Sequence, residues 1–491
     1  MLSRAPRTRT VSHLLLAGHN PLSPPPSYTS PIRQSPSNPS LAPVPFASWL
    51  SAVGREADAP SARVRAAAGG AGHSLLSYRN DHGVDRVLAL GSRNEAGQLG
   101  VGFASQEGTR GLVEGFEGEE VLQVRAGVQA SYLLVRTGED STALYSFGNL
   151  SRGRLGHPHL FSRDQLEADE EPRMHILPRA TEMRLPEGAG RITQIEAGFE
   201  HLLVLTEDGD IYGTGCNTDG QLGLSPSPSP SSPSSPNSPA EALSDIYQLT
   251  RLPLPAHIRT HEGGVAAIRA GADTSALITL SGKVFSWGNS EYAQALHSHP
   301  IDQIPSPREI DSSFLPSSRR IVDFRCGGSF SLVLDDQGSV YSAGYGALGL
   351  GKDAVRSLKA RRIDALEGEG VSRIRAGWGY AAAVRDAGSH SALWTWGLNN
   401  VHGRLGVGAL SSTASSASSP ASSSDRFASR RSSPTLQLPT HVYEPQRVEL
   451  PLQELGLRLG KGEWGLGEVE LGEEAMWVGV EAQEGVDGMA E

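Results

Sequence analysis

The sequence predicts an all-β protein built from repeated hairpins. Three observations support this prediction: an apolar segment ending in glycine recurs along the chain, a second glycine-ended segment alternates with it, and turn residues separate the two. The 491 residues include 57 glycines and 32 prolines, whereas aromatic residues make up only 6 %. This composition favours many tight turns and short strands over helical bundles.

The first repeated segment alternates β-branched and apolar residues, which predicts a strand. Its near-copies are VLQVRAG, ITQIEAG, VAAIRAG, IVDFRCG and VSRIRAG, at residues 121–127, 192–198, 265–271, 321–327 and 371–377. Weaker copies at 64–70 and 469–472 bring the number to seven. Three residues after each glycine comes one shared slot, which holds His73, Ala130, His201, Thr274, Phe330, Tyr380 and Ala475 in turn. An apolar strand follows the slot.

The second repeated segment follows a turn such as Glu207–Asp210 or Ser281–Gly282. Glycine and Asp tolerate the positive φ angles that tight hairpin turns require. The segment ends in LALG, YSFG, YGTG, FSWG, YSAG or WTWG, at residues 88–91, 145–148, 212–215, 285–288, 341–344 and 394–397. A second glycine turn, GQLG or GRLG, follows most copies. The two segments together predict a repeated hairpin.

This alternation of an Ala-Gly-x-x-His/Ser half with a Trp-Gly…Gly-Gln-Leu-Gly half resembles the regulator of chromosome condensation repeat, over about residues 64–480. The resemblance implies an all-β, seven-bladed β-propeller with four-stranded blades. Such blades close into a ring because their faces and edges stay exposed unless neighbours cover them. Segments 285–292 and 341–352 resemble the mitochondrial branch of this family.

The halves of the repeat do not balance, since seven first halves face only six second halves. The missing strand is expected near the N-terminus, and HLLLAGHN at residues 13–20 is the candidate. A strand there would close the ring by pairing the two ends of the chain within one blade. If these residues instead belong to a leader, one blade is defective.

The residues that recur at matching repeat positions are expected to be structural. Trp287 and Trp396 should pack between blades, and each indole N–H should find a partner. His73 and His201 share the repeated slot and are expected to be satisfied within the fold. The glycines expected to serve the repeat are Gly70, Gly91, Gly127, Gly148, Gly198, Gly215, Gly271, Gly288, Gly327, Gly344, Gly377 and Gly397.

One propeller is expected over residues 13–480, with its repeat core at 64–480. Two low-complexity loop inserts, at 225–240 and 411–436, contain too little apolar surface to fold and are expected to be disordered. The other segments outside the core are a Pro/Ser-rich stretch at 21–60 and an acidic tail at 481–491.

A mitochondrial leader is expected at residues 1–12. Residues 1–55 contain no Asp or Glu, and their charges are Arg4, Arg7, Arg9, Arg33 and Arg55. Such a composition is typical of a transit peptide, although a disordered Pro/Ser-rich tail is the alternative. No apolar stretch approaches the length of about 18 residues that spans a bilayer, so no membrane span is expected.

No motif predicts a catalytic, cofactor or metal site. Gly344–Gly349 matches a dinucleotide-binding glycine pattern, but its glycines fall in the register of the turns in other repeats. Asp353–Leu366 is expected to form one or two turns of amphipathic helix. The histidine pairs at 157/159 and 297/299 each lack a third ligand. We therefore expect no nucleotide and no metal ion at these positions.

Charges and cysteines narrow the function further. The net charge of −11 argues against a broad basic face for nucleic acid. The acidic run at 164–171 is expected to be a solvated insert, or alternatively a docking loop; the basic run at 426–431 is expected to be exposed, or alternatively to touch RNA. Cys216 and Cys326 are too few for a disulfide framework and are expected to be buried in a reducing compartment.

The predicted function is that of a non-enzymatic, monomeric interaction platform. Resemblance to the mitochondrial branch implies protein partners in ribosome or respiratory-complex assembly, with RNA as an indirect partner. The first alternative is guanine-nucleotide exchange on a small GTPase, as the founding family member performs; the second is a chromatin-associated regulator. A cytoplasmic or nuclear location is the alternative to mitochondria. No sequence pattern indicates which residues bind a partner.

Overall fold

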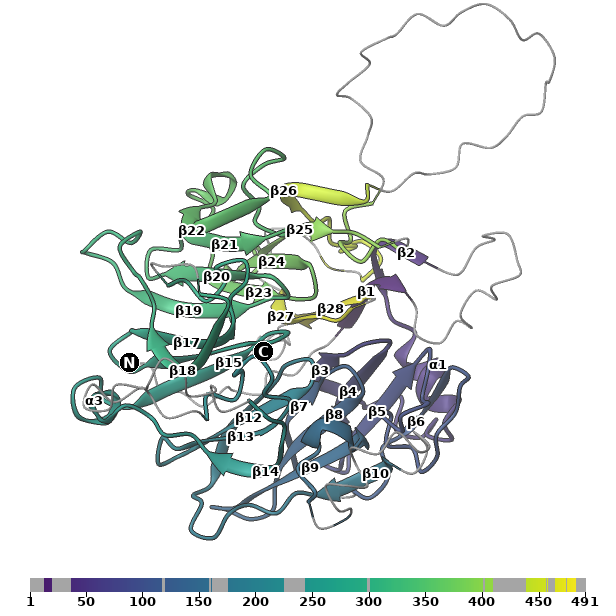
Figure 1. Cartoon of the computed structure of the whole chain (residues 1–491). Helices are drawn as coiled ribbons and strands as arrows, with labels where there is room; N and C mark the ends of the chain where they lie inside the picture. Colours follow the sequence, from purple (N-terminus) through teal and green to yellow (C-terminus); the bar gives the residue numbers. More distant parts are fainter. Residues whose placement is uncertain are drawn as a thin grey trace, which may run out of the picture.

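The computed structural model forms a ring of seven four-stranded antiparallel sheets (Figure 1). The predicted seven-bladed β-propeller is therefore confirmed. The residues that the structure describes are 13–19, 37–116, 120–158, 160, 175–224, 243–297, 301–400, 402–408, 439–455, 457, 464–473 and 475–482.

Six blades are each built from four strands that are consecutive in the sequence and run from the axis of the ring to its rim. Blade 1 comprises β3 (Arg63–Gly69), β4 (His73–Arg79), β5 (Asp85–Gly91) and β6 (Thr109–Leu112). Blade 2 comprises β7 (Glu120–Ala126), β8 (Ala130–Arg136), β9 (Thr142–Asn149) and β10 (Ile176–Glu182). Blade 3 comprises β11 (Ile192–Ala197), β12 (His201–Thr206), β13 (Ile211–Gly215) and β14 (Ile246–Arg251). Blade 4 comprises β15 (Val265–Ala270), β16 (Thr274–Thr279), β17 (Val284–Asn289) and β18 (Gln303–Glu309). Blade 5 comprises β19 (Ile321–Cys326), β20 (Phe330–Asp335), β21 (Val340–Tyr345) and β22 (Arg356–Arg362). Blade 6 comprises β23 (Arg373–Ala376), β24 (Tyr380–Arg385), β25 (Ala392–Leu398) and β26 (His441–Arg447).

The seventh blade joins the two ends of the described chain. Its strands are β27 (Trp464–Leu471), β28 (Ala475–Ala482), β1 (His13–His19) and β2 (Ser37–Pro43), in the order β2-β1-β28-β27. β1 pairs antiparallel with β28, so that Leu15 lies opposite Val478 and Leu16 opposite Trp477. All four of these side chains are buried. Residues 13–19 thus form the strand that the repeat count lacked.

The Pro/Ser-rich composition of residues 21–60 contained no signal for two elements that lie within it. β2 adds the outer strand of blade 7, and α1 (Phe46–Ser51) packs beside the ring. Trp49 of α1 is buried and makes an edge-to-face contact with Trp477, with ring centroids 6.2 Å apart. Tertiary burial of a few apolar residues stabilises α1 despite its polar surroundings.

The prediction of a helix at Asp353–Leu366 is wrong. Residues Arg356–Arg362 form β22, and only Asp364–Leu366 form a single 3-10 turn. β22 pairs with β21, and Arg361 lies opposite Ser342. The sheet overrides the local helical pattern because the fourth position of blade 5 needs a strand to cover β21.

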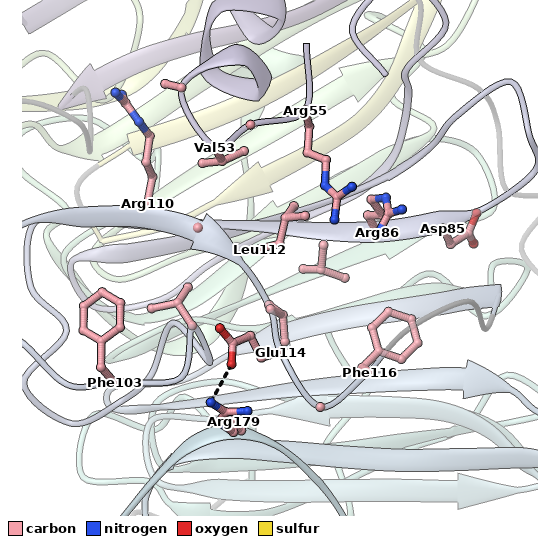
Figure 2. Close-up of a pocket in the computed structure, with 17 residues that line it drawn as sticks. Val53, Arg55, Asp85, Arg86, Phe103, Arg110, Leu112, Glu114, Phe116 and Arg179 are labelled. Atoms are coloured by element: carbon pink, nitrogen blue, oxygen red, sulfur yellow. Dashed lines mark ion pairs between the residues drawn. The ribbon is translucent and has the colours of Figure 1, made fainter. Parts of the chain in front are cut away.

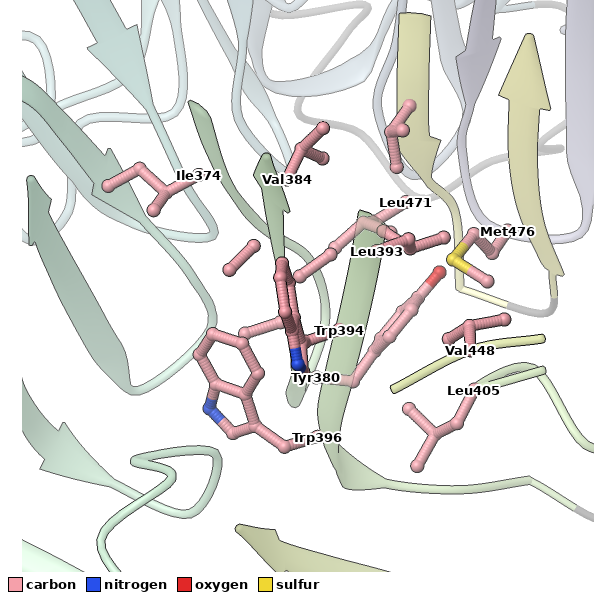
Figure 3. Packing of buried hydrophobic residues seen from close by; sticks show 14 of the residues in the cluster. Ile374, Tyr380, Val384, Leu393, Trp394, Trp396, Leu405, Val448, Leu471 and Met476 are labelled. Carbon is pink, nitrogen blue, oxygen red and sulfur yellow. The ribbon is translucent and has the colours of Figure 1, made fainter. Parts of the chain in front are cut away.

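The apolar core lies between neighbouring blades. Figure 3 shows one such cluster, in which Tyr380, Leu393 and Trp396 of blade 6 pack near Leu471 and Met476 of blade 7. Among the described residues, the remaining helical elements are short, namely α3 (Ala256–Thr260) and a 3-10 turn at Ser151–Gly153. Within the described residues, no helix has the length and apolarity needed to cross a membrane.

Several sequence-based expectations concern segments outside the described residues. They are the leader at 1–12, the inserts at 225–240 and 411–436, the charged runs at 164–171 and 426–431, and the acidic tail from residue 483 onward.

Candidate partner-binding surfaces

The glycines that end the first repeated segment lie where neighbouring blades approach most closely. A Cβ atom on Gly198 would lie 2.5 Å from the carbonyl oxygen of Gly271, and one on Gly271 would lie 2.5 Å from that of Gly327. Gly70 stands in the same relation to Gly127, also at 2.5 Å. Since real Cβ atoms do not approach oxygen this closely, only glycine fits here. A Cβ atom added at Gly127, Gly327 or Gly377 would likewise lie 2.8 Å or less from a neighbouring atom.

The glycines that end the second repeated segment serve mainly through their backbone conformation. Gly148, Gly215, Gly288, Gly344 and Gly397 have φ angles between 95° and 125°, a region that residues with a Cβ rarely adopt. Gly91 is the exception in this set, because its close neighbours rather than its φ angle restrict it: a Cβ there would lie 3.0 Å from the carbonyl oxygen of Gly72.

The repeated histidine slot is part of a hydrogen-bond chain between blades. His201 of blade 3 lies 2.9 Å from Ser275 Oγ of blade 4, and this hydroxyl donates to the carbonyl oxygen of Gln221 at 2.7 Å. The indole N–H of Trp287 donates to the same carbonyl at 2.9 Å. Burial lowers the pKa of His201 to about 3. The ring is therefore neutral and, because the serine proton is used, donates from Nε2.

Parts of this arrangement recur in other blades. His73 lies 2.9 Å from Ser131 Oγ, which donates to the carbonyl oxygen of Gln98, and burial lowers the pKa of His73 to about 4. The Trp396 indole donates to the carbonyl oxygen of Ala347 at 2.9 Å. These side chains are buried and join neighbouring blades, so they are not accessible to a partner.

The motifs that imitate chemical sites have structural surroundings. Gly344–Gly349 joins two antiparallel strands, and Gly349 lies against the indole of Trp396. His157 and His297 occupy equivalent positions and bond to serine hydroxyls of their own blades. Across the described residues, no three His, Cys, Asp or Glu side chains gather as a metal ion would require.

The two cysteines are free and buried. Burial raises the pKa of the Cys326 thiol to about 12. A thiol in this environment stays protonated and is a poor nucleophile.

The innermost strands carry paired charges around the axis of the ring. Arg125 of β7 pairs with Glu196 of β11 at 3.2 Å, and Arg269 of β15 pairs with Asp323 of β19 at 2.7 Å. Burial opposes ionisation of Asp323, but Arg269 and Arg325 outweigh it and lower the pKa to about 2. These four charges near the axis are therefore paired, whereas burial raises the pKa of Glu470, on the innermost strand of blade 7, to about 7.

Two aromatic rings meet across one end of this axis. Phe199 follows the innermost strand of blade 3 and Trp378 follows that of blade 6, yet their ring centroids are 4.1 Å apart. Blades 3 and 6 are not neighbours in the ring, so this contact crosses the central opening. The axis is thus obstructed rather than open to a ligand at this end.

The three longest connections between strands start from one face of the propeller, which we name the insert face. It is the face where first strands turn into second strands and third strands lead to fourth strands. Third-to-fourth connections include residues 150–175, 216–245 and 399–440, whereas on the opposite face the second-to-third turns are as short as 207–210. The described residues that flank both low-complexity inserts therefore lie at the insert face.

A cleft of about 750 Å³ lies at the rim between blades 1 and 2 (Figure 2). Val53 and Arg55, which follow α1, line it together with Arg110 of β6. Glu114 and Arg179 form an ion pair of 3.0 Å across it. Apolar side chains and arginines could hold an anionic group with an apolar neighbour. No sequence pattern indicated this cleft, because none of its lining belongs to a repeat motif and part depends on α1.

Models of a known repeat family match segments within the blades. Models described as regulator of chromosome condensation (RCC1) repeat match residues 192–221 and 265–294, and a second model of the same description matches 281–334. These segments include strands of blades 3, 4 and 5.

Known proteins with similar sequences come from animals and plants. The human RCC1-like G exchanging factor-like protein is 29 % identical over 368 residues, which are 71 % of this chain and 70 % of that protein. The Arabidopsis thaliana ultraviolet-B receptor UVR8 is 26 % identical over 360 residues, covering 72 % and 69 %. The mitochondrial RCC1 domain-containing protein RUG3 of the same plant is 27 % identical over 333 residues, covering 67 % and 64 %.

Solved structures share the fold at lower sequence identity. Human WBSCR16 superposes with a TM-score of 0.66 at 22 % identity, over 96 % of this chain and 100 % of that one. Yeast RCC1 (Prp20), solved bound to Kap60, gives 0.62 at 16 % identity, over 97 % and 91 %.

Proposed function

Because this chain is a regulator of chromosome condensation (RCC1) repeat protein, we propose that it is a non-enzymatic platform whose insert face binds protein or ribonucleoprotein partners. The observation that carries the proposal is that the interior of the ring and one of its faces differ in structure. The repeated polar side chains join blades to one another, and the three longest connections between strands all begin and end at one face. A rigid scaffold that presents variable loops is typical of binding proteins.

We propose mitochondria as the location. The similarity to a plant relative described as mitochondrial supports this, as does the absence of Asp and Glu from residues 1–55. A fusion of residues 1–60 to a fluorescent reporter should enter mitochondria. A fusion in which Arg4, Arg7 and Arg9 are replaced by Glu should stay outside. Equal cytosolic signals from both fusions would reject this location.

The proposed partners are mitochondrial assembly factors and ribosome components. Affinity purification of the tagged chain from isolated mitochondria, with and without ribonuclease, tests this by mass spectrometry. We expect assembly factors or ribosomal proteins to be recovered above the background of an unrelated tagged matrix protein. A variant without residues 225–240 and 411–436 serves as the matched comparison for the insert face. Recovery of nothing above background would overturn the platform proposal.

The similarity to a human protein named as G exchanging factor-like supports a second candidate, nucleotide exchange on a small GTPase. Release of a fluorescent GDP analogue, measured over a panel of purified small GTPases, distinguishes the two functions. Acceleration of release by the purified chain would establish exchange. Release at the spontaneous rate for every GTPase in the panel would reject exchange and leave the platform proposal standing.

A further inference from the structure

Aromatic and basic side chains gather at the insert face of blades 4, 5 and 6 and continue along β22, the outermost strand of blade 5. Tyr345, at the end of β21, is 48 % exposed, and Tyr443 of β26 is 40 % exposed. Both lie beside third-to-fourth connections of their blades. Figure 1 shows β21 and β22 next to β25 and β26. We name this surface, made of Tyr292, Tyr345, Lys352, Arg356, Lys359, Arg361 and Tyr443, the aromatic strip.

The aromatic rings of the strip are arranged as flat platforms. Tyr345 stacks on Tyr292 of the neighbouring blade, with centroids 5.2 Å apart and an angle of 28° between the rings. The Arg356 guanidinium lies over the Tyr292 ring at 6.0 Å. In blade 6, His441 stacks on Tyr443 at 4.2 Å and 19°. The two platforms are connected, because the Gly351 amide donates to the carbonyl oxygen of Tyr443.

Within the described residues, the cations of the strip form no ion pair, and Arg356 contacts the Tyr292 ring. Arg362 of β22 pairs with Asp364 and Glu367. Within the part of the chain that the structure describes, by contrast, no carboxylate forms an ion pair with Lys352, Arg356, Lys359 or Arg361. Residues 352–362 contain five cations and one Asp in a chain whose net charge is −11. This local excess attracts an anionic partner.

We propose that the aromatic strip binds single-stranded RNA, which rests on the proposed function as a platform for ribonucleoprotein partners. Single strands are held by aromatic rings on which bases stack, beside cations that follow the phosphates. The strip supplies both.

The geometry of β22 disfavours an acidic peptide added as an extra strand. The pairing of β22 with β21 shifts register between Ser342 and Gly344, which marks a bulge in the outermost strand of the blade. A bulge bends an edge strand and interrupts the regular ladder that an added strand needs. Stacking of bases does not require such a ladder.

The test uses the purified full-length chain and a fluorescein-labelled 12-nucleotide oligouridylate, followed by fluorescence anisotropy. Tyr345→Ala should weaken binding roughly 5- to 100-fold, the range expected for loss of one stacked base. Leu280→Ala removes a large apolar side chain that is 43 % exposed in the turn between β16 and β17, on the face opposite the insert face, and it should bind like the parent.

Charge reversal tests the phosphate contacts. Lys359→Glu/Arg361→Glu should weaken binding at least about tenfold and flatten its salt dependence, since each phosphate contact contributes to the salt slope. Arg63→Glu/Arg184→Glu changes the net charge equally at exposed positions on blades 1 and 2, and it should retain parental affinity. All four variants alter exposed side chains, so melting temperatures near that of the parent are expected.

Three outcomes would overturn the RNA assignment. The first is that oligouridylate does not bind, and the second is that the strip variants and their controls lose equal affinity. The third is that the chain binds an oligoglutamate peptide instead of RNA, and that Lys359→Glu/Arg361→Glu abolishes binding of this peptide. The last outcome would assign the strip to acidic protein segments. Each would leave the platform proposal standing if mitochondrial partners are still recovered, so the two failures can be told apart.

Discussion

Single side chains hold neighbouring blades together, and Trp396 illustrates how. Its ring is fully buried in blade 6, and its N–H reaches the carbonyl oxygen of Ala347 in blade 5. Trp287 makes the equivalent bond from blade 4 to Gln221 in blade 3. The Trp-Gly element of one repeat thus bonds to the glycine turn that follows the previous repeat.

Trp396→Ala should lower the free energy of unfolding by about 3–5 kcal/mol, because it removes a large buried side chain and leaves a carbonyl without its donor. The urea midpoint measures this loss. Trp396→Phe, which keeps much of the ring volume, should lose less. An unchanged midpoint for Trp396→Ala, accompanied by loss of a partner, would instead assign this residue to recognition.

His201 should make the stability of the ring depend on pH. Its folded pKa is about 3, below the ordinary value of 6.5, so between these values the unfolded chain binds a proton that the folded chain does not. Stability is therefore complete above pH 6.5 and is lost as the pH falls toward 3. At pH 5 the loss is about 2 kcal/mol from this residue.

Comparison of variants isolates the contribution of His201. His201→Gln should lose less stability than the parent between pH 7 and pH 5, as measured by urea midpoints at each pH. His82→Gln is the control, because the His82 side chain is 79 % exposed and meets water whether the chain is folded or unfolded. If His201→Gln keeps the full pH slope of the parent, the assignment to His201 is wrong.

At the scale of elements, blade 7 closes the ring, and its strands come from two separate segments of the chain. β1 lies between β2 and β28, and Leu15 and Leu16 are at most 2 % exposed. Without β1, the edge of β28 and the apolar side chains of two neighbouring blades would meet water.

Removal of residues 1–19 should therefore open the ring, lower the melting temperature and increase binding of the hydrophobic dye ANS. Removal of residues 1–12 leaves β1 intact and should give a melting temperature close to that of the parent. Equal melting curves for the two truncations would show that β1 does not close the ring in solution.

At the scale of the whole molecule, the propeller separates a closed framework from the long connections at its insert face. The residues on either side of the third-to-fourth connection of blade 6 are paired with each other, since Leu398 of β25 lies opposite His441 of β26. The framework therefore does not depend on how long this connection is.

Deletion of residues 411–436 should change the free energy of unfolding by less than about 1 kcal/mol, because loop-closure entropy grows only slowly with length. Thermal melting of the shortened chain measures this. Deletion of residues 441–447, which removes β26, should instead unfold blade 6. A large loss of stability in the first variant would indicate that the insert packs against the ring.

The sequence alone determined the number of blades, their inner strands and the need for a strand from the N-terminal part. This was possible because each blade buries the same apolar pattern and requires glycine at the same close approach, as at Gly198 and Gly271. A constraint that recurs in every copy becomes visible as a repeat.

Only the tertiary structure decided the features that occur once. α1 and β2 have no strong local pattern, and the segment expected to be helical became β22 because β21 required a neighbour. The cleft at the rim and the aromatic strip join residues from different blades, such as Tyr292 and Tyr345. Their proximity follows from the curvature of the closed ring, which no local sequence pattern encodes.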